Sequence, residues 1–328
     1  MLKIPYFLRS ASNSRIVKIR ELVEGLGSGA YENNDYGNLQ VLNEYLGRQF
    51  NKPISTRITH GWAWKYPGQT PYLNNFQHTL VWGEESRKYA HQKGWTNFVD
   101  VGAVWLYFLD IMTRNGWTGI EFTPTIDELW VLGAHSNTST EMNTQQIAEF
   151  LAEAARSKVD RKVVLLTSHD YEKAKLGKLL DGIPFPVLTL GPRRITNLAN
   201  SHYMQLYFLL KNTRLVKTNY PTTLLLYAHT VGCELSFIKD NDFLEALDFA
   251  KITEDLGLEH FLSCTFDTAE DLDAYVMGRL GSQSFRSLSE MESLLKFQAS
   301  NYLLVRLIYS VIQLVRVLLS KLIRHVSL

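Results

Sequence analysis

The second half of the chain alternates between short, uniformly apolar segments and longer segments in which apolar residues recur every three or four positions. The first pattern predicts buried strands, and the second predicts helices that cover them. We expect strands at 128–133, 162–167, 186–190, 214–218 and 235–238, and helices at 144–157, 171–180, 202–210 and 221–231. This alternation is typical of a doubly wound α/β domain with a parallel sheet.

The first 125 residues show a weaker form of the same pattern. It predicts helices at 37–50 and 84–94 and strands at 54–58, 79–82 and 98–101. A loop-rich passage near 117–127, with Gly119 and Pro124, marks a domain boundary. The expected fold class is therefore α/β, with two Rossmann-like doubly wound domains at 1–124 and 125–285, and a C-terminal amphipathic helix at 286–328.

The last part of the chain, 300–328, is rich in Leu, Val and Ile. Polar and basic residues recur on one helical stripe, at Arg306, Ser310, Gln313, Arg316, Ser320 and Arg324. The charges interrupt the segment too often for it to span a bilayer. A basic amphipathic helix of this kind either rests on an anionic membrane surface or packs on the protein or a second subunit.

Composition and charge narrow the classes of function. With 45% hydrophobic, 20% charged and 12% aromatic residues among 328, the chain is a folded protein and not a disordered one. Lys plus Arg number 34 against 33 Asp plus Glu, so no overall positive field favours nucleic acid as a partner. Cys233 and Cys264 lack zinc-ligand spacing, and the N-terminus lacks a signal-peptide pattern. We therefore expect a cytoplasmic protein.

Ligands of open α/β sheets bind beyond the carboxyl ends of the strands, so the residues that follow strands are the candidates. His60 follows the strand at 54–58 and suits a general base, although a lone histidine is commonly structural. After the strand at 162–167, Ser168 or Asp170 is expected to cap the next helix, which leaves His169 to face a ligand. Arg193, in a Gly-Pro-Arg-Arg turn, is either a phosphate clamp or a solvated surface residue.

The most favourable phosphate site is the start of the helix at 221–231, where Asn219, Thr222 and Thr223 stand beside free backbone N–H groups. Asp240 and Asp242 form an Asp-x-Asp pattern, but with Glu245 they fit a helix capping box better than a metal site. No metal is expected. The sequence also lacks GxGxxG, Walker A, HExxH and GxSxG motifs, which argues against dehydrogenases, P-loop kinases, zincins and hydrolases.

Several short motifs together resemble bacterial glycosyltransferases of the two-Rossmann-domain (GT-B) type that act in capsule, lipopolysaccharide or related surface polysaccharide synthesis. The resemblance covers roughly residues 30–240. Its motifs are His60-Gly61-Trp62, Val81-Trp82-Gly83, Val101-Gly102, the segment 165–171, Thr189-Leu190-Gly191-Pro192-Arg193 and Thr218-Asn219-Tyr220-Pro221-Thr222-Thr223. The stretch 216–238 is similar to the donor-binding element of that fold, although its turn contains Tyr220-Pro221 where many members carry an acidic residue or a second glycine.

This resemblance implies metal-independent sugar transfer without a cofactor. The nucleotide-sugar donor would lie in the second domain, with its phosphates held by His169, Arg193, Asn219, Thr222 and Thr223. His60 would deprotonate the hydroxyl of a saccharide or lipid-linked acceptor, and domain closure would exclude water.

Trp62 and Trp64 would stack on acceptor sugars, and the C-terminal helix would hold the enzyme at the inner membrane face. Two alternatives remain open. One is a nucleotide-sugar epimerase of the same architecture, and the other is a scaffold subunit that has lost the chemistry.

Overall fold

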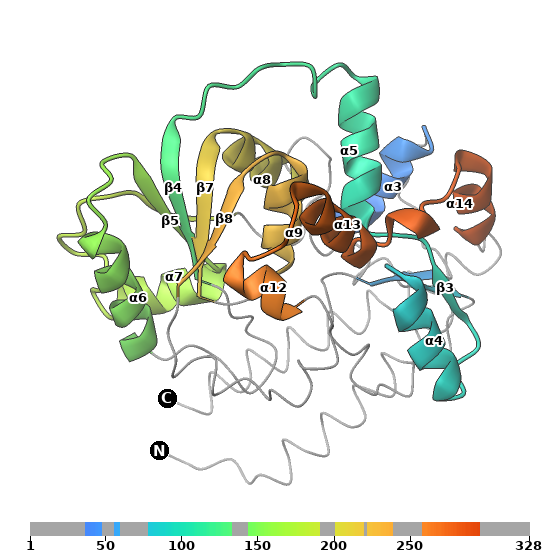
Figure 1. Cartoon of the computed structure of the whole chain (residues 1–328). Helices are drawn as coiled ribbons and strands as arrows, with labels where there is room; N and C mark the ends of the chain where they lie inside the picture. Colours follow the sequence, from blue (N-terminus) through green and yellow to red (C-terminus); the bar gives the residue numbers. More distant parts are fainter. Residues whose placement is uncertain are drawn as a thin grey trace, which may run out of the picture.

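A computed structural model describes residues 37–47, 56–59, 78–132, 144–190, 201–219, 222–238 and 258–295. The described residues form two sheets, one of three strands and one of five, in which every paired strand is parallel (Figure 1). The predicted α/β class with two Rossmann-like units is confirmed. The basic segment at 300–328 lies outside the described residues, as do Asp240, Asp242 and Glu245.

The larger sheet has the strand order β6-β5-β4-β7-β8. Its strands are β4 (Ile126–Val131), β5 (Lys162–Leu166), β6 (Val187–Thr189), β7 (Thr213–Thr218) and β8 (Glu234–Phe237). The chain first runs outward from β4 to β6 and then returns to add β7 on the other side of β4. This reversal gives the sheet a topological switch point between β4 and β7.

Helices cover both faces of the larger sheet. On one face, α6 (Thr144–Arg156) and α7 (Ser168–Leu176) pack against Trp130, Val164 and Leu166. On the other face, α8 (His202–Lys211) and α9 (Thr223–Thr230) pack against Leu129 and Val216. Successive residues of β4 thus enter different cores, because strand side chains alternate between faces.

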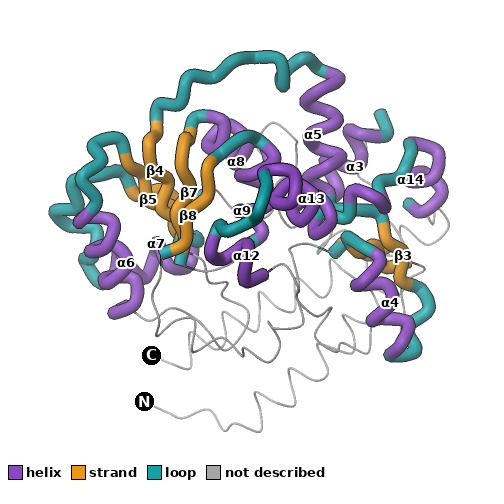
Figure 2. The backbone as a smooth tube through the Cα atoms, viewed as in Figure 1, coloured by secondary structure: helices purple, strands orange, loops and turns teal. Residues whose placement is uncertain are grey.

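The smaller sheet has the order β1-β2-β3, from β1 (Thr56–Ile58), β2 (His78–Val81) and β3 (Phe98–Asp100). Its outer face contacts α4 (Glu84–Gln92) through Ala90. Its inner face contacts α3 (Asn38–Tyr45) and α5 (Val104–Arg114). Figure 2 shows the two sheets as separate groups of strands, with helices between them.

The helix α5, the helices α12 (Leu258–Ser263) and α13 (Ala269–Arg279) and the 3-10 turn η3 (Ser282–Ser284) were not among the predicted elements. The helix α14 (Leu288–Leu294) lies within the segment 286–328 that was expected to be a C-terminal helix. Trp105 and Tyr107, on opposite sides of α5, are both fully buried. The first five residues of α5, 104–108, are all buried, and its polar residues Asp110, Thr113 and Arg114 appear only further along the helix.

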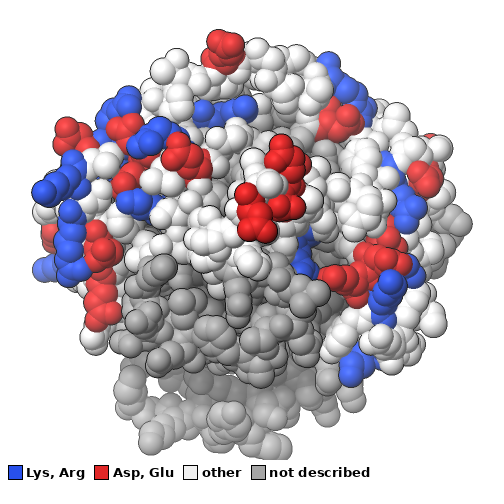
Figure 3. All heavy atoms as spheres, in the orientation of Figure 1, with Lys and Arg blue, Asp and Glu red and all other residues white. Residues whose placement is uncertain are grey.

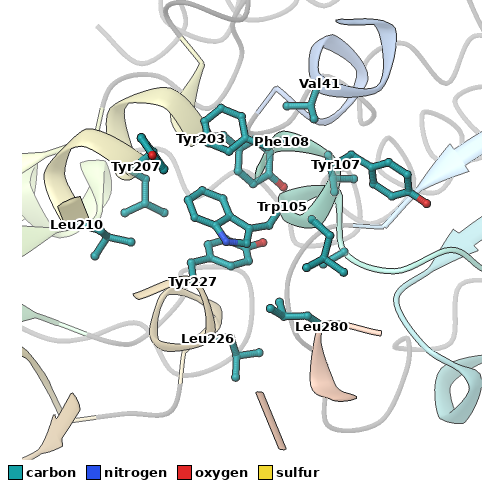
Figure 4. Packing of buried hydrophobic residues seen from close by; sticks show 14 of the residues in the cluster. Val41, Trp105, Tyr107, Phe108, Tyr203, Tyr207, Leu210, Leu226, Tyr227 and Leu280 are labelled. Atoms are coloured by element: carbon teal, nitrogen blue, oxygen red, sulfur yellow. The ribbon is translucent and has the colours of Figure 1, made fainter. Parts of the chain in front are cut away.

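The helix α5 joins the two units through one aromatic core (Figure 4). The Trp105 ring stacks on Tyr227 of α9 with ring centroids 4.5 Å apart, and its Nε1 donates a hydrogen bond of 2.8 Å to Thr230 Oγ1. Trp105 also contacts Tyr203 and Tyr207 of α8, at centroid distances of 5.8 and 6.5 Å. The two sheets therefore share a core through their facing helices.

Residues 279–295, which we call the return segment, follow the larger unit in sequence but pack on the smaller sheet. Ala103 N donates a hydrogen bond of 2.7 Å to Leu280 O. Gly281, at a φ of +68°, lies so close to β2 that an added Cβ would stand 1.7 Å from Trp82 O. Arg286 donates from Nη2 and Nε to Asp100 O at 2.9 and 3.1 Å. The return segment thereby covers the carboxyl ends of β2 and β3.

A buried carboxylate, Glu128, stabilises the larger sheet near its amino edge. It accepts hydrogen bonds from Lys217 Nζ at 2.5 Å, Ser157 Oγ at 2.7 Å and Trp130 Nε1 at 2.8 Å. Burial by itself raises the pKa of Glu128, but these three donors outweigh it and hold the pKa below its ordinary value. The carboxylate is therefore charged and fully paired at neutral pH.

A lowered carboxyl pKa adds stability above the ordinary pKa value, and this stability is lost as the pH falls through the folded-state pKa. We expect Glu128→Gln to lower the free energy of unfolding by about 1–3 kcal/mol at neutral pH, and by less below pH 4.5, the ordinary value for this carboxyl. Urea unfolding at several pH values measures this difference. The matched control is Glu153→Gln, on an exposed i,i+3 pair with Arg156. A loss for Glu128→Gln that does not change with pH would contradict the assignment.

Candidate functional site

The carboxyl ends of β4 and β7 form the candidate site, because the strand order reverses between them. β7 ends at the buried Thr218 and is followed by the half-buried Asn219. The chain then turns into α9, whose N-cap is Thr222. Asn219, Thr222 and Thr223 therefore lie together at the switch point, at the start of a helix whose dipole favours an anion.

Thr222 differs from the other described Ser and Thr N-caps. In α7, α8, α13 and α14, the side chains of Thr167, Ser201, Thr268 and Ser287 accept a hydrogen bond from a backbone N–H of the first turn. Thr222 makes no such bond, and its Oγ1 is buried without a hydrogen-bond partner among the described residues. A buried hydroxyl without a partner is unfavourable by roughly 1–3 kcal/mol, so the local structure leaves a hydrogen bond to be made.

His169 is the second residue of α7 and is exposed at the carboxyl end of β5. β4 lies between β5 and β7, so the ends of β5 and β7 are about 10 Å apart. His169 therefore belongs to the same edge as Thr222 but not to its immediate surroundings.

The cap of α7 differs from the one expected. Thr167, and not Ser168 or Asp170, is the N-cap: its hydroxyl accepts from Asp170 N at 3.1 Å and donates to Asp170 Oδ2 at 2.6 Å. The correction has a simple reason. The helix begins at Ser168, so Asp170 is its third residue, where a carboxylate completes a capping arrangement.

Four of the predicted site residues lie outside the described residues: His60, Trp62, Trp64 and Arg193. The described residue next to His60 is Thr59, which directly follows β1. The Thr59 hydroxyl donates a hydrogen bond of 2.7 Å to Leu80 O of β2. This bond fixes the end of β1, the strand that leads into His60.

The other strand ends of the smaller sheet are occupied by the return segment. At the end of β3, Asp100 receives a hydrogen bond of 2.7 Å from Ser284 and lies 2.7 Å from Arg87 Nε. Burial by itself raises the pKa of Asp100, but the Ser284 bond and the charges of Arg87 and Arg286 lower it below the ordinary value. Asp100 is therefore a charged structural group that stays paired, unlike a general acid or base.

Trp82, between β2 and α9, carries a polar group that the sequence did not single out. It directly follows β2, is 6% exposed and lies 6.3 Å from the Tyr227 ring of α9 between centroids. Its Nε1 is buried without a hydrogen-bond partner among the described residues. The apolar run 79–82 marks Trp82 as a core residue, and no pattern in the sequence shows that its N–H is left unpaired.

The charged groups of the described residues show neither a metal site nor a broad basic surface on the face in view. No group of three or more His, Cys, Asp or Glu residues in the described part of the chain is placed to hold a metal ion. Basic and acidic side chains are interspersed over the face seen in Figure 3. Within the described ranges, no helix is both long and apolar enough to cross a membrane.

Comparison with known proteins gives a distant likeness of fold. No family model and no curated protein matches the sequence. The structure is similar to UDP-GlcNAc 2-epimerase from Neisseria meningitidis bound to UDP-GlcNAc, with 12% identity and a TM-score of 0.34 over 68% of this chain and 62% of that chain. It is also similar to UDP-GlcNAc 2-epimerase from Methanocaldococcus jannaschii, with 13% identity and a TM-score of 0.31 over 73% and 64% of the two chains. TM-scores of this size carry no information on activity.

Proposed function

We propose that this chain is a cytoplasmic glycosyltransferase. It would transfer a sugar from a nucleotide-activated donor to a saccharide or lipid-linked acceptor in the synthesis of a cell-surface polysaccharide. The observation that carries the proposal is the Thr222 hydroxyl at the start of α9, which has no hydrogen-bond partner among the described residues and lies on the switch-point edge of a five-stranded parallel sheet.

The diphosphate of the donor fits this position for three physical reasons. The helix N-terminus carries partial positive charge, its first-turn amides point along the axis toward an anion, and the Thr222 hydroxyl can donate one further hydrogen bond. The residues of the turn, Asn219, Thr222 and Thr223, are all neutral, so none of their side chains repels an anion. We include Arg193 and His169 in the proposed donor site.

The proposed chemistry is an acid–base transfer without a metal or cofactor. His60 would take the proton of the acceptor hydroxyl as that oxygen attacks the anomeric carbon and the bond to the nucleotide phosphate breaks. Negative charge then develops on the leaving phosphate, where α9, Thr222 and Arg193 would stabilise it. Trp62 and Trp64 would stack on the acceptor sugar.

Substitution of Thr222 tests the donor site by separating ligand binding from protein stability. We expect Thr222→Val to raise the free energy of unfolding by up to about 1–3 kcal/mol, because it removes a buried hydroxyl that has no partner among the described residues. The same change should weaken nucleotide binding about 10–100-fold, since a hydrogen bond to a charged group contributes roughly 1.5–3 kcal/mol. Thermal melting with CMP, CDP, UDP, GDP and ADP measures both quantities.

Thr268→Val is the matched control. Thr268 caps α13 with a real hydrogen bond, 3.0 Å from Asp271 N, so its loss should lower stability by about 1 kcal/mol and leave nucleotide binding intact. A nucleotide-dependent rise in melting temperature that survives in Thr222→Val would reject the phosphate site. No rise with any of the five nucleotides would reject nucleotide-sugar binding and favour the scaffold alternative.

Product analysis separates transfer from isomerisation. With the nucleotide sugar that stabilises the protein, a transferase releases the nucleotide only when an acceptor is present. An epimerase converts the sugar with the nucleotide still attached and needs no acceptor.

We also propose that the basic segment at 300–328 binds the inner membrane face. It would bring the enzyme to a lipid-linked acceptor through apolar contacts and the charges of Arg306, Arg316, Lys321 and Arg324. The full chain should sediment with vesicles that contain phosphatidylglycerol, and high salt should release it in part. Equal binding to neutral phosphatidylcholine vesicles, or no binding to either, would contradict this role.

A further inference from the structure

We infer that the two α/β units form one rigid body that unfolds cooperatively and does not hinge. The carboxyl ends of the strands in the two sheets then take up their relative position when the protein folds. No later closing motion changes that position. This inference does not rest on the proposed function, because it concerns contacts between the units and not their ligands.

The first argument is the apolar core between the units. α5 of the smaller unit packs into α8 and α9 of the larger one, with Trp105 and Phe108 among Tyr203, Tyr207 and Tyr227. Trp105, Phe108 and Tyr207 are 0% exposed. Interfaces between domains that move are usually more polar than this, and a packed apolar core does not deform continuously.

The second argument is that a hinge motion would have to break specific polar bonds across the same core. Trp105 Nε1 is bonded to Thr230 Oγ1 at 2.8 Å, and the buried Tyr203 hydroxyl donates to Asn38 Oδ1 at 2.6 Å. Buried donors that lose their partners destabilise the opened state by roughly 1–3 kcal/mol each. Opening of the interface is therefore opposed by hydrogen bonds as well as by apolar burial.

The third argument is the return segment together with α13, which contact both units. On the larger unit, α13 packs on α9, and His229 Nε2 lies 3.4 Å from Asp273 Oδ1. On the smaller unit, Gly281 fits against Trp82 O with no room for a side chain, and the Thr56 hydroxyl donates to Leu294 O at 2.7 Å. A chain segment held by backbone contacts at one end and by a helix at the other restrains rotation of the two units.

These attachments act on different sides of the smaller sheet. α5 lies on its inner face, while residues 280–286 lie across the carboxyl ends of β2 and β3. A rotation that kept the contacts of α5 intact would disturb those of residues 280–286, and a rotation that kept the latter would disturb the former. The domain closure that the sequence resemblance implies would therefore have to break contacts of α5 or of the return segment.

Distance measurement between spin labels on the two units tests this inference directly. Labels at Lys88→Cys on α4 and Arg156→Cys on α6 occupy exposed positions, in a protein that also carries Cys264→Ser. The remaining Cys233 is buried, and burial raises the pKa of its thiol to about 12, so it does not react with the label. The pair Arg156→Cys and Glu234→Cys, within the larger unit, shows the spread that the labels alone produce.

We expect one distance between the units, no broader than the control, that shifts by less than about 2 Å with CMP, UDP or GDP. Two populations, a distribution clearly broader than the control, or a larger shift would overturn the inference. The ligand-free distribution alone decides the question of a hinge, so the test stands even if none of the nucleotides binds.

Hydrogen exchange provides a second measurement on the protein without labels. We expect the same free energy of opening, with the same dependence on urea, for the backbone amides of β2 and β3 as for those of β4 and β7. This is the behaviour of one cooperative unit. Exchange of the smaller sheet at a clearly lower free energy would show that it opens alone, and would overturn the inference.

Discussion

Gly281→Ala is expected to lower the free energy of unfolding by about 3 kcal/mol or more. An added Cβ would stand 1.7 Å from Trp82 O and 2.6 Å from the carbonyl carbon, and both atoms belong to backbone that cannot rotate away. The φ of +68° adds a further penalty of roughly 1–2 kcal/mol for any residue with a side chain. The return segment would have to withdraw from the end of β2. Urea unfolding followed by circular dichroism measures the loss.

Gly278→Ala, three positions earlier in the chain, is the matched control. Gly278 lies inside α13, and a Cβ there would meet no atom within 4 Å. The same substitution should therefore stabilise the protein by up to about 1 kcal/mol through helix propensity. If both alanine variants were as stable as the wild type, the close approach of Gly281 to Trp82 would be wrong.

Trp105→Ala is expected to destabilise the protein by about 3–5 kcal/mol, the usual range for removal of a large buried aromatic side chain. The indole stacks on Tyr227 and Phe108, at centroid distances of 4.5 and 5.2 Å, and these residues belong to different units. Their contact would be replaced by a cavity. Calorimetry should show a lower melting temperature and a broader or divided transition, because the variant weakens the coupling between the units.

Two milder variants separate the contribution of the ring packing from that of the hydrogen bond to Thr230. Trp105→Phe keeps a ring in the core but loses the bond to Thr230, and Thr230→Val removes that bond while Trp105 stays in place. We expect each variant to lower the free energy of unfolding by about 1–2 kcal/mol. The main cause is the smaller ring in Trp105→Phe and the buried indole N–H left without its acceptor in Thr230→Val. A wild-type melting temperature in Trp105→Ala would exclude a structural role for this core.

The sequence predicted the strands best, because each is a short segment that ends at polar or turn residues. All eight described strands coincide with predicted ones to within two residues at either end. The clearest case is β5, whose five residues are all buried and whose residues 163–166 form a continuous apolar run. The helix α9 was predicted at 221–231 and observed at Thr223–Thr230. A doubly wound sheet implies one chain reversal, but the pattern could not predict that it falls between β4 and β7, since strand order depends on long-range pairing.

The elements that join the units were the ones missed. In α5, seven of eleven residues are buried and polar residues appear only towards its C-terminal end, so its sequence resembles one apolar run more than a helix with two faces. In α13, Val276 is the one buried residue, so its sequence shows no apolar face. For the site, the rule that ligands bind after strands selected Asn219, Thr222 and Thr223 as candidates at the start of a helix expected from residue 221. In the structure the helix begins at Thr223, so Thr222 is its N-cap. That its hydroxyl lacks a partner depends on surroundings that no local pattern encodes.

The contacts of the return segment also set the order in which this protein can be completed on the ribosome. The bonds from Thr56 to Leu294 and from Tyr45 to Arg286 connect residues 238 and 241 positions apart. The strands of the smaller sheet are synthesised early, yet the backbone that covers the ends of β2 and β3 is translated only after the whole larger sheet. A nascent chain that ends before residue 280 would expose the groups around Trp82 and Gly102 that later become buried. Such late, distant contacts slow folding and favour association with chaperones during synthesis.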